Sequence, residues 1–151
     1  MLIIIILLIG ILIFIIYKTS DRSKFVDLGL PSGTLWAKEN LKGRFSGGYS
    51  VKYFAEMLPT INQWKELQKY CRWEWVGNGF MVYGSNGKSI FLPADGERVN
   101  NEIIHEEGSK GNYMVFDGTE DGLVRFSFWQ KYFEFPTKSY SQASVRLIKK
   151  K

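Results

Sequence analysis

One short run of the chain combines aromatic rings with amide and ammonium groups, and these residue types bind sugars, peptides or membrane interfaces. The run is Ser127-Phe128-Trp129-Gln130-Lys131-Tyr132, and it lies between the last predicted strands. A Trp and a Tyr at the tip of a hairpin offer apolar faces with polar edges. Trp129 and Tyr132 are therefore candidate ligand-binding residues. The alternative is that Phe128 and Trp129 continue a longer strand into the core.

Nucleophilic and zinc chemistry lack the residues that they need. The chain has one Cys, Cys71, and one His, His105. They can meet only through a tertiary contact that no motif predicts, and no serine lies in a nucleophile elbow or an oxyanion-loop motif. His105 has only glutamates nearby and no second His or spare thiol to complete a zinc site, so we expect it in a surface loop. We predict no catalytic residue, no metal and no cofactor.

The acidic stretch at residues 117–122 resembles part of a calcium loop. Its acids stand at positions one and five with glycine at six, but Phe128 replaces the closing Glu that an EF-hand loop needs at position twelve. A solvated turn between two strands accounts for every residue of the stretch. The lone thiol of Cys71 has no partner for an internal disulfide, and we expect it to pack as a small apolar group.

The composition is that of a folded domain and not of a disordered tail. Of the 151 residues, 45% are hydrophobic and 16% are aromatic. This is enough to form a buried core without disulfide bonds. The formal charge of +5 is spread along the chain apart from Lys149-Lys150-Lys151, and no basic stripe is interleaved with exposed aromatics. This distribution does not predict nucleic-acid binding.

An apolar segment stands near the start of the sequence. Residues 2–17 contain no charged side chain, and a helix of that length spans ~25 Å, against about 30 Å for the hydrocarbon core of a bilayer. A soluble core helix is not normally apolar on every face. We therefore predict that residues 1–18 are a transmembrane anchor or an uncleaved signal, that residues 2–17 contact the membrane, and that residues 19–24 form a linker.

The rest of the chain alternates short strands with turns and contains one clear helix. Thr60 and Gln63 have the spacing of a capping box, and a second helix is predicted over residues 50–57. The apolar residues that follow Thr60 recur on one helical face, namely Ile61, Trp64, Leu67 and Cys71. Strands are predicted at residues 25–28, 34–37, 80–83, 89–92, 113–116, 123–128, 133–135 and 143–148, the last two completing an antiparallel sheet.

Four ordered sequence blocks resemble a known family. They are residues 26–37 (Val-Asp-Leu-Gly-Leu-Pro-Ser-Gly-Thr-Leu-Trp-Ala), 58–75, 83–98, and the closing Ser144-Val145-Arg146. In this order they resemble the FISUMP domain, the Fibrobacter succinogenes major paralogous domain, which is similar to the C-type lectin-like and formylglycine-generating-enzyme folds. The resemblance covers most of the chain after residue 25, and the predicted domain comprises residues 25–151. It implies an α+β, C-type-lectin-like mixed fold of mainly antiparallel strands with one or two helices. The apolar segment adds a single transmembrane helix before this domain.

The chain also departs from the family pattern. Glu39 stands where many relatives have a cysteine that the resemblance implies to be the partner of Cys71, and a long excursion before Leu58 is missing. By analogy with the ligand contacts of lectin-like folds, Tyr140 and Gln142 join Trp129 and Tyr132 as candidate ligand-binding residues. The calcium-chelating strings of calcium-dependent lectins are missing as well, so a sugar would be bound by stacking and hydrogen bonds.

These patterns predict a membrane-anchored, non-enzymatic binding module of a bacterial envelope that recognises a glycan or a protein ligand. The resemblance favours the exported side of a single-pass membrane protein. Lys18, Arg22 and Lys24 follow the apolar segment with nothing basic before it, which favours the cytoplasmic side instead. The alternative is therefore a structural or accessory membrane protein whose cytoplasmic domain docks a partner.

Overall fold

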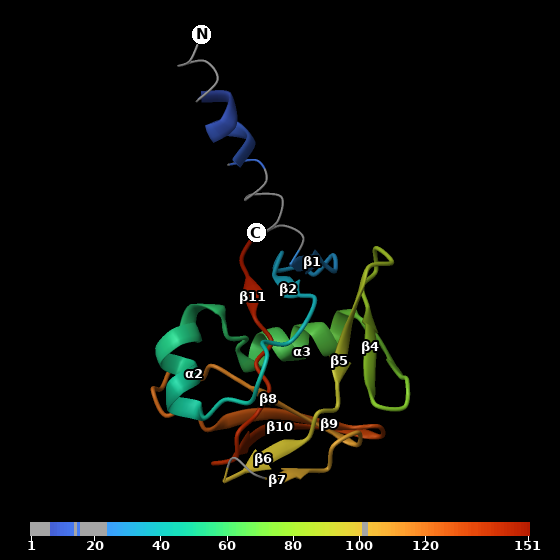
Figure 1. Ribbon diagram of the computed structural model, residues 1–151. Helices are drawn as coiled ribbons and strands as arrows, with labels where there is room; N and C mark the ends of the chain where they lie inside the picture. Colours follow the sequence, from blue (N-terminus) through green and yellow to red (C-terminus); the bar gives the residue numbers. More distant parts are fainter. Residues whose placement is uncertain (1–6, 14, 16–23, 101–102) are drawn as a thin grey trace.

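The domain consists of short strands in small antiparallel sheets, with one helix packed between two of the sheets and another at the side of the domain (Figure 1). The arrangement is seen in a computed structural model, which describes residues 7–13, 15, 24–100 and 103–151. From residue 24 onward the elements are β1 (Phe25–Asp27), β2 (Leu35–Ala37), α2 (Gly47–Phe54), the 3-10 helix η1 (Ala55–Met57), α3 (Ile61–Tyr70), β3 (Arg72–Trp75), β4 (Gly79–Tyr83), β5 (Ser89–Pro93), β6 (Glu97–Val99), β7 (Ile103–His105), β8 (Lys110–Met114), β9 (Val124–Trp129), β10 (Tyr132–Lys138) and β11 (Ile148–Lys149).

The strands pair in the orders β1-β2-β11, β10-β9-β8, β3-β4-β5 and β6-β7. All pairs between these strands are antiparallel. The first sheet joins the beginning and the end of the described domain, because Ile148 lies opposite Trp36. The α+β class and the mainly antiparallel pairing expected from the sequence are confirmed. The finer C-type-lectin-like assignment stays a prediction.

Helix α3 begins at the capping box that the sequence predicted. The Thr60 hydroxyl accepts a hydrogen bond from the Gln63 backbone N–H at 3.3 Å, and the Gln63 side-chain oxygen accepts one from the Thr60 N–H at 2.8 Å. Trp64 and Leu67 are fully buried on its inner face, and Cys71 packs beside them at the helix end. Two backbone donors that a helix start leaves free are thus satisfied locally.

Trp64 connects two of the sheets through the core. Its ring lies 4.8 Å from that of Trp36 in β2, 5.3 Å from Tyr113 in β8 and 4.4 Å from Phe126 in β9. In Figure 1, α3 lies between the sheet β1-β2-β11 above and the sheet β10-β9-β8 below. The apolar stripe read from the sequence therefore holds these two sheets together.

The segment at residues 143–148 does not complete the expected antiparallel sheet. Only Ile148 and Lys149 form a strand, β11, and it pairs with β2. Before that, Ser144 makes a single parallel bridge to Tyr113, and Ala143 bridges Phe45. This segment runs between β8 and the chain that leaves β2, and its apolar residues are buried there. Its apolar and polar residues alternate as in a half-buried strand, but here the alternation does not indicate one.

Arg146, in the closing block Ser144-Val145-Arg146, has a structural role. The side chain is 1% exposed. It donates to the Asn40 side-chain oxygen at 2.6 Å and to the carbonyls of Ala37, Lys38 and Phe91. A buried guanidinium needs many acceptors, and here most are backbone carbonyls. Arg146 therefore fastens β5 to the chain that follows β2.

The second helix and the position of His105 differ in detail from the sequence predictions. The second helix, α2, begins at Gly47 and ends at Phe54, and η1 covers the remaining residues of the predicted range. His105 is exposed, but it ends strand β7 and does not lie in a loop. The hairpin β6-β7 itself was not predicted, because its strands are short and carry charged residues.

The apolar segment is described only in part. Residues 7–13 are helical, and their large side chains are 51–61% exposed, namely Leu7, Leu8, Ile9, Ile11, Leu12 and Ile13. Of the predicted anchor at residues 1–18, only residues 7–13 and Ile15 are described. Of the predicted linker at residues 19–24, only Lys24 is described, and the others lie outside the described residues. Within the described ranges, no helix has the length and hydropathy that crossing a bilayer requires.

Candidate functional site

The turn between β9 and β10 separates a core residue from two surface residues. Phe128 is fully buried and packs over Gly111 on the neighbouring strand, where a Cβ atom would lie 2.1 Å from its ring. Trp129 is half-buried, and Tyr132 is 54% exposed. Phe128 therefore continues the core, whereas Trp129 and Tyr132 form a surface feature that we call the aromatic tip. Ligand binding by these two residues stays a prediction.

Three side chains form a ladder across the strands at the aromatic tip. Lys110, Trp129 and Tyr132 lie at the same register on β8, β9 and β10. The rings of Trp129 and Tyr132 stack with centroids 4.6 Å apart and an interplanar angle of 15°, and the Lys110 ammonium lies 4.9 Å from the Trp129 ring centroid. Because β9 is the middle strand, Lys110 and Tyr132 approach Trp129 from opposite sides. Tyr132 thus has the outward aromatic face of the ladder.

A shallow hollow lies beside the ladder. Its volume is about 380 Å³. Three turns meet there, the ones that follow β3, β7 and β9. The lining residues are Trp75, Gly77, Gly108, Ser109, Trp129, Gln130, Lys131 and Tyr132. An aromatic face, a hydroxyl, an amide and an ammonium group therefore surround one opening.

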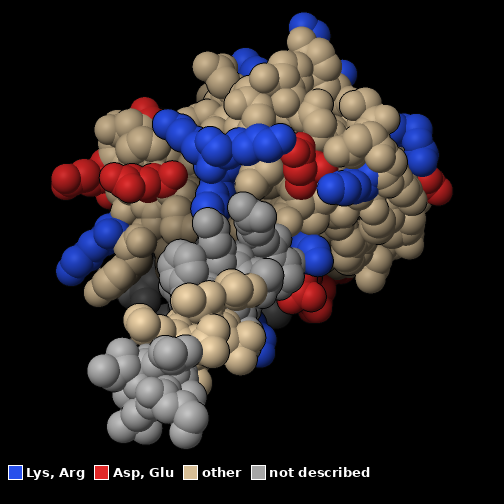
Figure 2. Space-filling view, turned by 90° about the horizontal axis from the view of Figure 1, so that it is seen from above, with Lys and Arg blue, Asp and Glu red and all other residues tan. Residues whose placement is uncertain are grey.

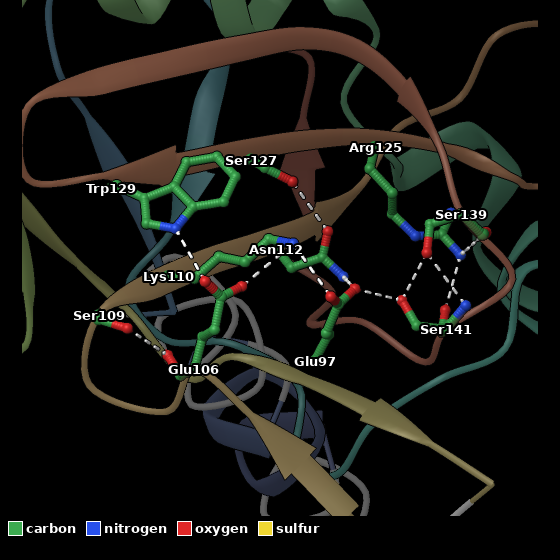
Figure 3. A network of polar contacts seen from close by, with 10 residues as sticks. All are labelled: Glu97, Glu106, Ser109, Lys110, Asn112, Arg125, Ser127, Trp129, Ser139 and Ser141. Carbon is green, nitrogen blue, oxygen red and sulfur yellow. Dashed lines mark hydrogen bonds and ion pairs between the residues drawn. The ribbon is translucent and has the colours of Figure 1, made fainter.

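A polar network lies next to the ladder (Figure 3). The Trp129 indole N–H donates to Glu106 at 3.4 Å, and Lys110 pairs with Glu106 at 3.6 Å and with Glu97 at 3.0 Å. Glu97 also accepts a hydrogen bond of 2.6 Å from the Ser141 hydroxyl. Lys110 is thus held between two carboxylates while it contacts Trp129, which fixes the inner part of the ladder.

The network lowers the pKa of Glu97. Burial alone raises this pKa, but the hydrogen bonds from Ser141 and Lys110 favour the carboxylate and outweigh it. Glu97 therefore stays ionised at neutral pH. Its negative charge in turn keeps the Lys110 ammonium in place beside the indole ring.

Sequence reasoning missed the residues that support this network. Asn112 accepts from the Ser127 hydroxyl at 3.0 Å and donates to Glu97 at 3.4 Å. Arg125 is fully buried and donates to the carbonyls of Ser139 and Ser141 at 3.1 and 3.0 Å. The available signal was the alternation of Arg125 and Ser127 with phenylalanines in β9. That pattern ordinarily indicates a solvent-facing side, whereas here both faces of the strand are covered.

Tyr140 and Gln142 lie in a different hollow from Trp129 and Tyr132. Tyr140 is 89% exposed, and the Gln142 backbone forms a bridge to Arg98 in β6. They line a second hollow of about 270 Å³ together with Arg98, Val99, Asn100 and Ser141. The four candidate residues therefore form two pairs. In Figure 3 the polar network that includes Trp129 extends through Glu97 to Ser141, which lines the second hollow.

Cys71 and the acidic turn at residues 117–122 are in surroundings that suit a structural role. Burial raises the pKa of the Cys71 thiol to about 11, so the thiol is protonated at neutral pH. In the acidic turn, Asp117 and Asp121 both accept a hydrogen bond from the Thr119 hydroxyl, at 2.7 and 2.8 Å. No group of three or more potential metal-ligating side chains occurs among the residues that the structure describes.

Comparison with known proteins gives no relative from which a function can be taken. No family model matches the chain, and no curated protein or solved structure matches it. The resemblance to the FISUMP domain therefore stays a prediction from the sequence blocks.

Proposed function

We propose that the chain is a membrane-anchored, non-enzymatic binding module whose domain recognises a carbohydrate at the aromatic tip. The observation that carries this proposal is the ladder of Lys110, Trp129 and Tyr132. In it the Tyr132 ring stacks on Trp129, and Tyr132 stays 54% exposed at the edge of a hollow. A ring that is fixed before binding loses little conformational freedom when a ligand arrives.

The chemistry around Tyr132 suits a sugar ring. The C–H face of a pyranose packs on a flat aromatic face, and its hydroxyl groups need donors and acceptors at the rim. Ser109, Gln130 and Lys131 supply such groups around the hollow. A peptide side chain would be expected to seek a deeper apolar pocket, so we favour a glycan over a protein ligand.

The membrane part of the proposal is supported by the exposed helix at residues 7–13. Its large apolar side chains have about half or more of their surface free of protein contact. A group of such side chains on a soluble surface is unfavourable, and a bilayer would cover them. This exposure supports the membrane anchor, and the sequence resemblance favours a bacterial envelope protein with the domain on the exported side.

Glycan-array binding of the full chain in detergent tests the aromatic tip. We expect Tyr132→Ala to weaken the best glycan by about tenfold, because the outward stacking face is lost. Tyr70→Ala is the matched control, since Tyr70 is also an exposed tyrosine but lies on α3. Tyr140→Ala separately tests the second hollow. Equal glycan binding by Tyr132→Ala and the unaltered chain would remove the aromatic tip from the proposal. A protein captured only by the unaltered chain would assign a protein ligand instead.

A second candidate is a cytoplasmic domain that docks a partner as a structural or accessory membrane protein. The observation in its favour is that Lys149 and Lys151 contact Phe25 and Asp27 of β1, the strand that directly follows Lys24. Basic residues beside a membrane span favour the cytoplasmic side. A reporter fused after Lys151 distinguishes the candidates, because activity on the cytoplasmic side alone contradicts the exported binding module.

A further inference from the structure

Lysines that are far apart in the sequence gather around the sheet β1-β2-β11. Lys24 directly precedes β1, and its carbonyl accepts a hydrogen bond from the Lys38 N–H at 2.9 Å. The Lys149 ammonium lies 5.9 Å from the centroid of Phe25, and the Lys151 ammonium lies 2.7 Å from the Asp27 carboxylate. We call this surface the basic face. Its exposed lysines are Lys24, Lys38, Lys88, Lys149, Lys150 and Lys151.

The negative charge on this face is smaller than the positive charge. The hydrogen bond from Lys151 is the main cause that lowers the pKa of Asp27, and the nearby charge of Lys88 adds to it. Asp27 is therefore ionised, and Glu39 is exposed on the same side. The lysines nevertheless outnumber these carboxylates. Figure 2 looks onto this end of the molecule, and blue Lys and Arg side chains gather near the centre of the view.

A hollow with an apolar floor opens on the basic face. Its volume is about 560 Å³. Phe25, Leu41, Met57 and Leu147 are among its lining residues, and the other lining residues include Lys24 and Lys38. Met57 is 37% exposed there. Glu39 also lines this hollow, so two ammonium groups face one carboxylate there. Apolar side chains beside a net positive charge match a phospholipid, whose phosphate is anionic and whose acyl parts are apolar.

The covalent chain keeps this face close to the predicted membrane segment. Tyr17 ends the apolar run and Lys24 begins the described domain. The seven residues from one to the other span at most about 25 Å even when fully extended. A face tethered at that distance meets the bilayer surface at a high effective concentration. Charge attraction acts over a Debye length of about 8 Å at physiological salt, so the face must dock directly to gain from it.

We infer that the basic face rests on the anionic lipid surface of the bilayer that holds the apolar segment. This inference rests on the proposed membrane anchoring. The lysines supply the attraction to lipid phosphates, and the hollow beside Lys24 and Lys38 takes the apolar part of a lipid at the contact. Docking fixes the orientation of the domain, so that the sheet β10-β9-β8 is turned away from the membrane (Figure 1).

The test uses the full chain in nanodiscs made either of phosphatidylcholine alone or of phosphatidylcholine with phosphatidylglycerol. Amide hydrogen exchange is measured in β1, β2 and β11, with β8 and β9 as internal reference. We expect exchange in the first group to be about tenfold slower in the anionic discs. The reference strands keep the same rates in both lipids, which also shows that the domain is folded.

Charge variants assign the effect to the basic face. The variant Lys149→Gln, Lys150→Gln, Lys151→Gln loses most of the lipid-dependent protection. The matched control, Lys65→Gln, Lys69→Gln, Lys138→Gln, removes the same charge from exposed lysines elsewhere and keeps the protection. Equal exchange in both lipids, or equal loss in both variants, overturns the inference.

Flotation of the full chain with vesicles separates this inference from the proposed anchoring. A chain that floats with both lipids but shows no lipid-dependent protection overturns only the docking of the basic face. A chain that floats with neither lipid overturns both the anchoring and the docking. A chain that floats with both, and is protected in the anionic discs alone, supports both.

Discussion

The aromatic tip and the basic face use different physics on the same small domain. At the tip, Lys110 is only 13% exposed and is held between two carboxylates, and the rings of Trp129 and Tyr132 stack in a fixed register. On the basic face, Lys151 is 67% exposed although it contacts Asp27. The tip thus offers a preorganised short-range contact, whereas the face offers loosely held charge.

This difference indicates which ligand suits each region. Charges that are already paired contribute little to the attraction of an ion, so the tip suits a neutral ligand that stacks and hydrogen-bonds. Exposed charges of one sign attract an oppositely charged surface without requiring an exact fit. A domain that carries both can be held on a membrane at one end and bind a ligand at the other.

The largest effect is expected when the core contact between the two regions is removed. Trp64 packs between Trp36 on the side of the basic face and Phe126 on the side of the tip. Trp64→Ala should lower the free energy of unfolding by about 3–5 kcal/mol, because a fully buried aromatic side chain is lost. Urea unfolding measures this loss. Trp129→Ala is the control, and a loss as large as that of Trp64→Ala contradicts the surface position of Trp129.

Salt should affect the two regions differently. At about 1 M salt the Debye length falls to about 3 Å, so attraction between exposed lysines and lipid phosphates is largely screened. We expect the lipid-dependent exchange protection of β11 to disappear, while glycan affinity at the tip changes by less than about twofold. Both quantities are measured on the same nanodisc preparation. A parallel decline of both would remove the distinction between the regions.

Acid should lower the free energy of unfolding, because Glu97 beside the aromatic tip becomes protonated. The folded-state pKa of Glu97 lies below its ordinary value of 4.5, so its contribution is present above that value and is lost as the pH falls through the folded-state pKa. Glu97→Gln should cost about 1 kcal/mol near neutral pH, with the difference from the unaltered chain shrinking below pH 4.5. Urea unfolding across pH measures the difference. Glu107→Gln, an exposed neighbour, should leave the pH profile unchanged.

The smallest effect is expected at Cys71, which belongs to neither region. Its pKa is raised from 9.0 to about 11, mainly by burial. The thiolate fraction at mildly alkaline pH is then about a hundredfold lower than for an ordinary cysteine. Reaction with a disulfide reagent should be correspondingly slow, and Cys71→Ser should leave both glycan binding and lipid protection intact. Rapid labelling of the folded chain would contradict the burial of this thiol.

Much of the local structure was predictable from the sequence because its causes lie within a few residues. The capping box of Thr60 and Gln63 starts α3, and the spacing of Trp64 and Leu67 gives its buried face. The turn before Lys88 closes a hairpin because Gly87 takes a positive φ of 81°. The segment at residues 143–148 was misassigned, because its partners in β8 and β2 lie far away in the chain.

The candidate site was predictable only in part. The residue types of the run that contains Trp129 and Tyr132 indicated a surface contact, and the exposure of Tyr132 agrees with that reading. Nothing local indicated that Lys110 would cover one face of Trp129. Nor did the sequence separate Tyr140 and Gln142 from the other pair, since that depends on where β6 packs.

The apolar segment, the capped helix, the hairpin turns and the aromatic residues between β9 and β10 could all be predicted from the order of the residues. These follow from composition, periodicity and turn chemistry, which act over short stretches of chain. Only the tertiary structure decided that Lys149 and Lys151 lie against β1, that Arg125 and Arg146 are buried among carbonyls, and that Tyr132 carries the open face of the ladder. Those facts depend on contacts between distant segments, and such contacts form only when the sheets pack around a common core.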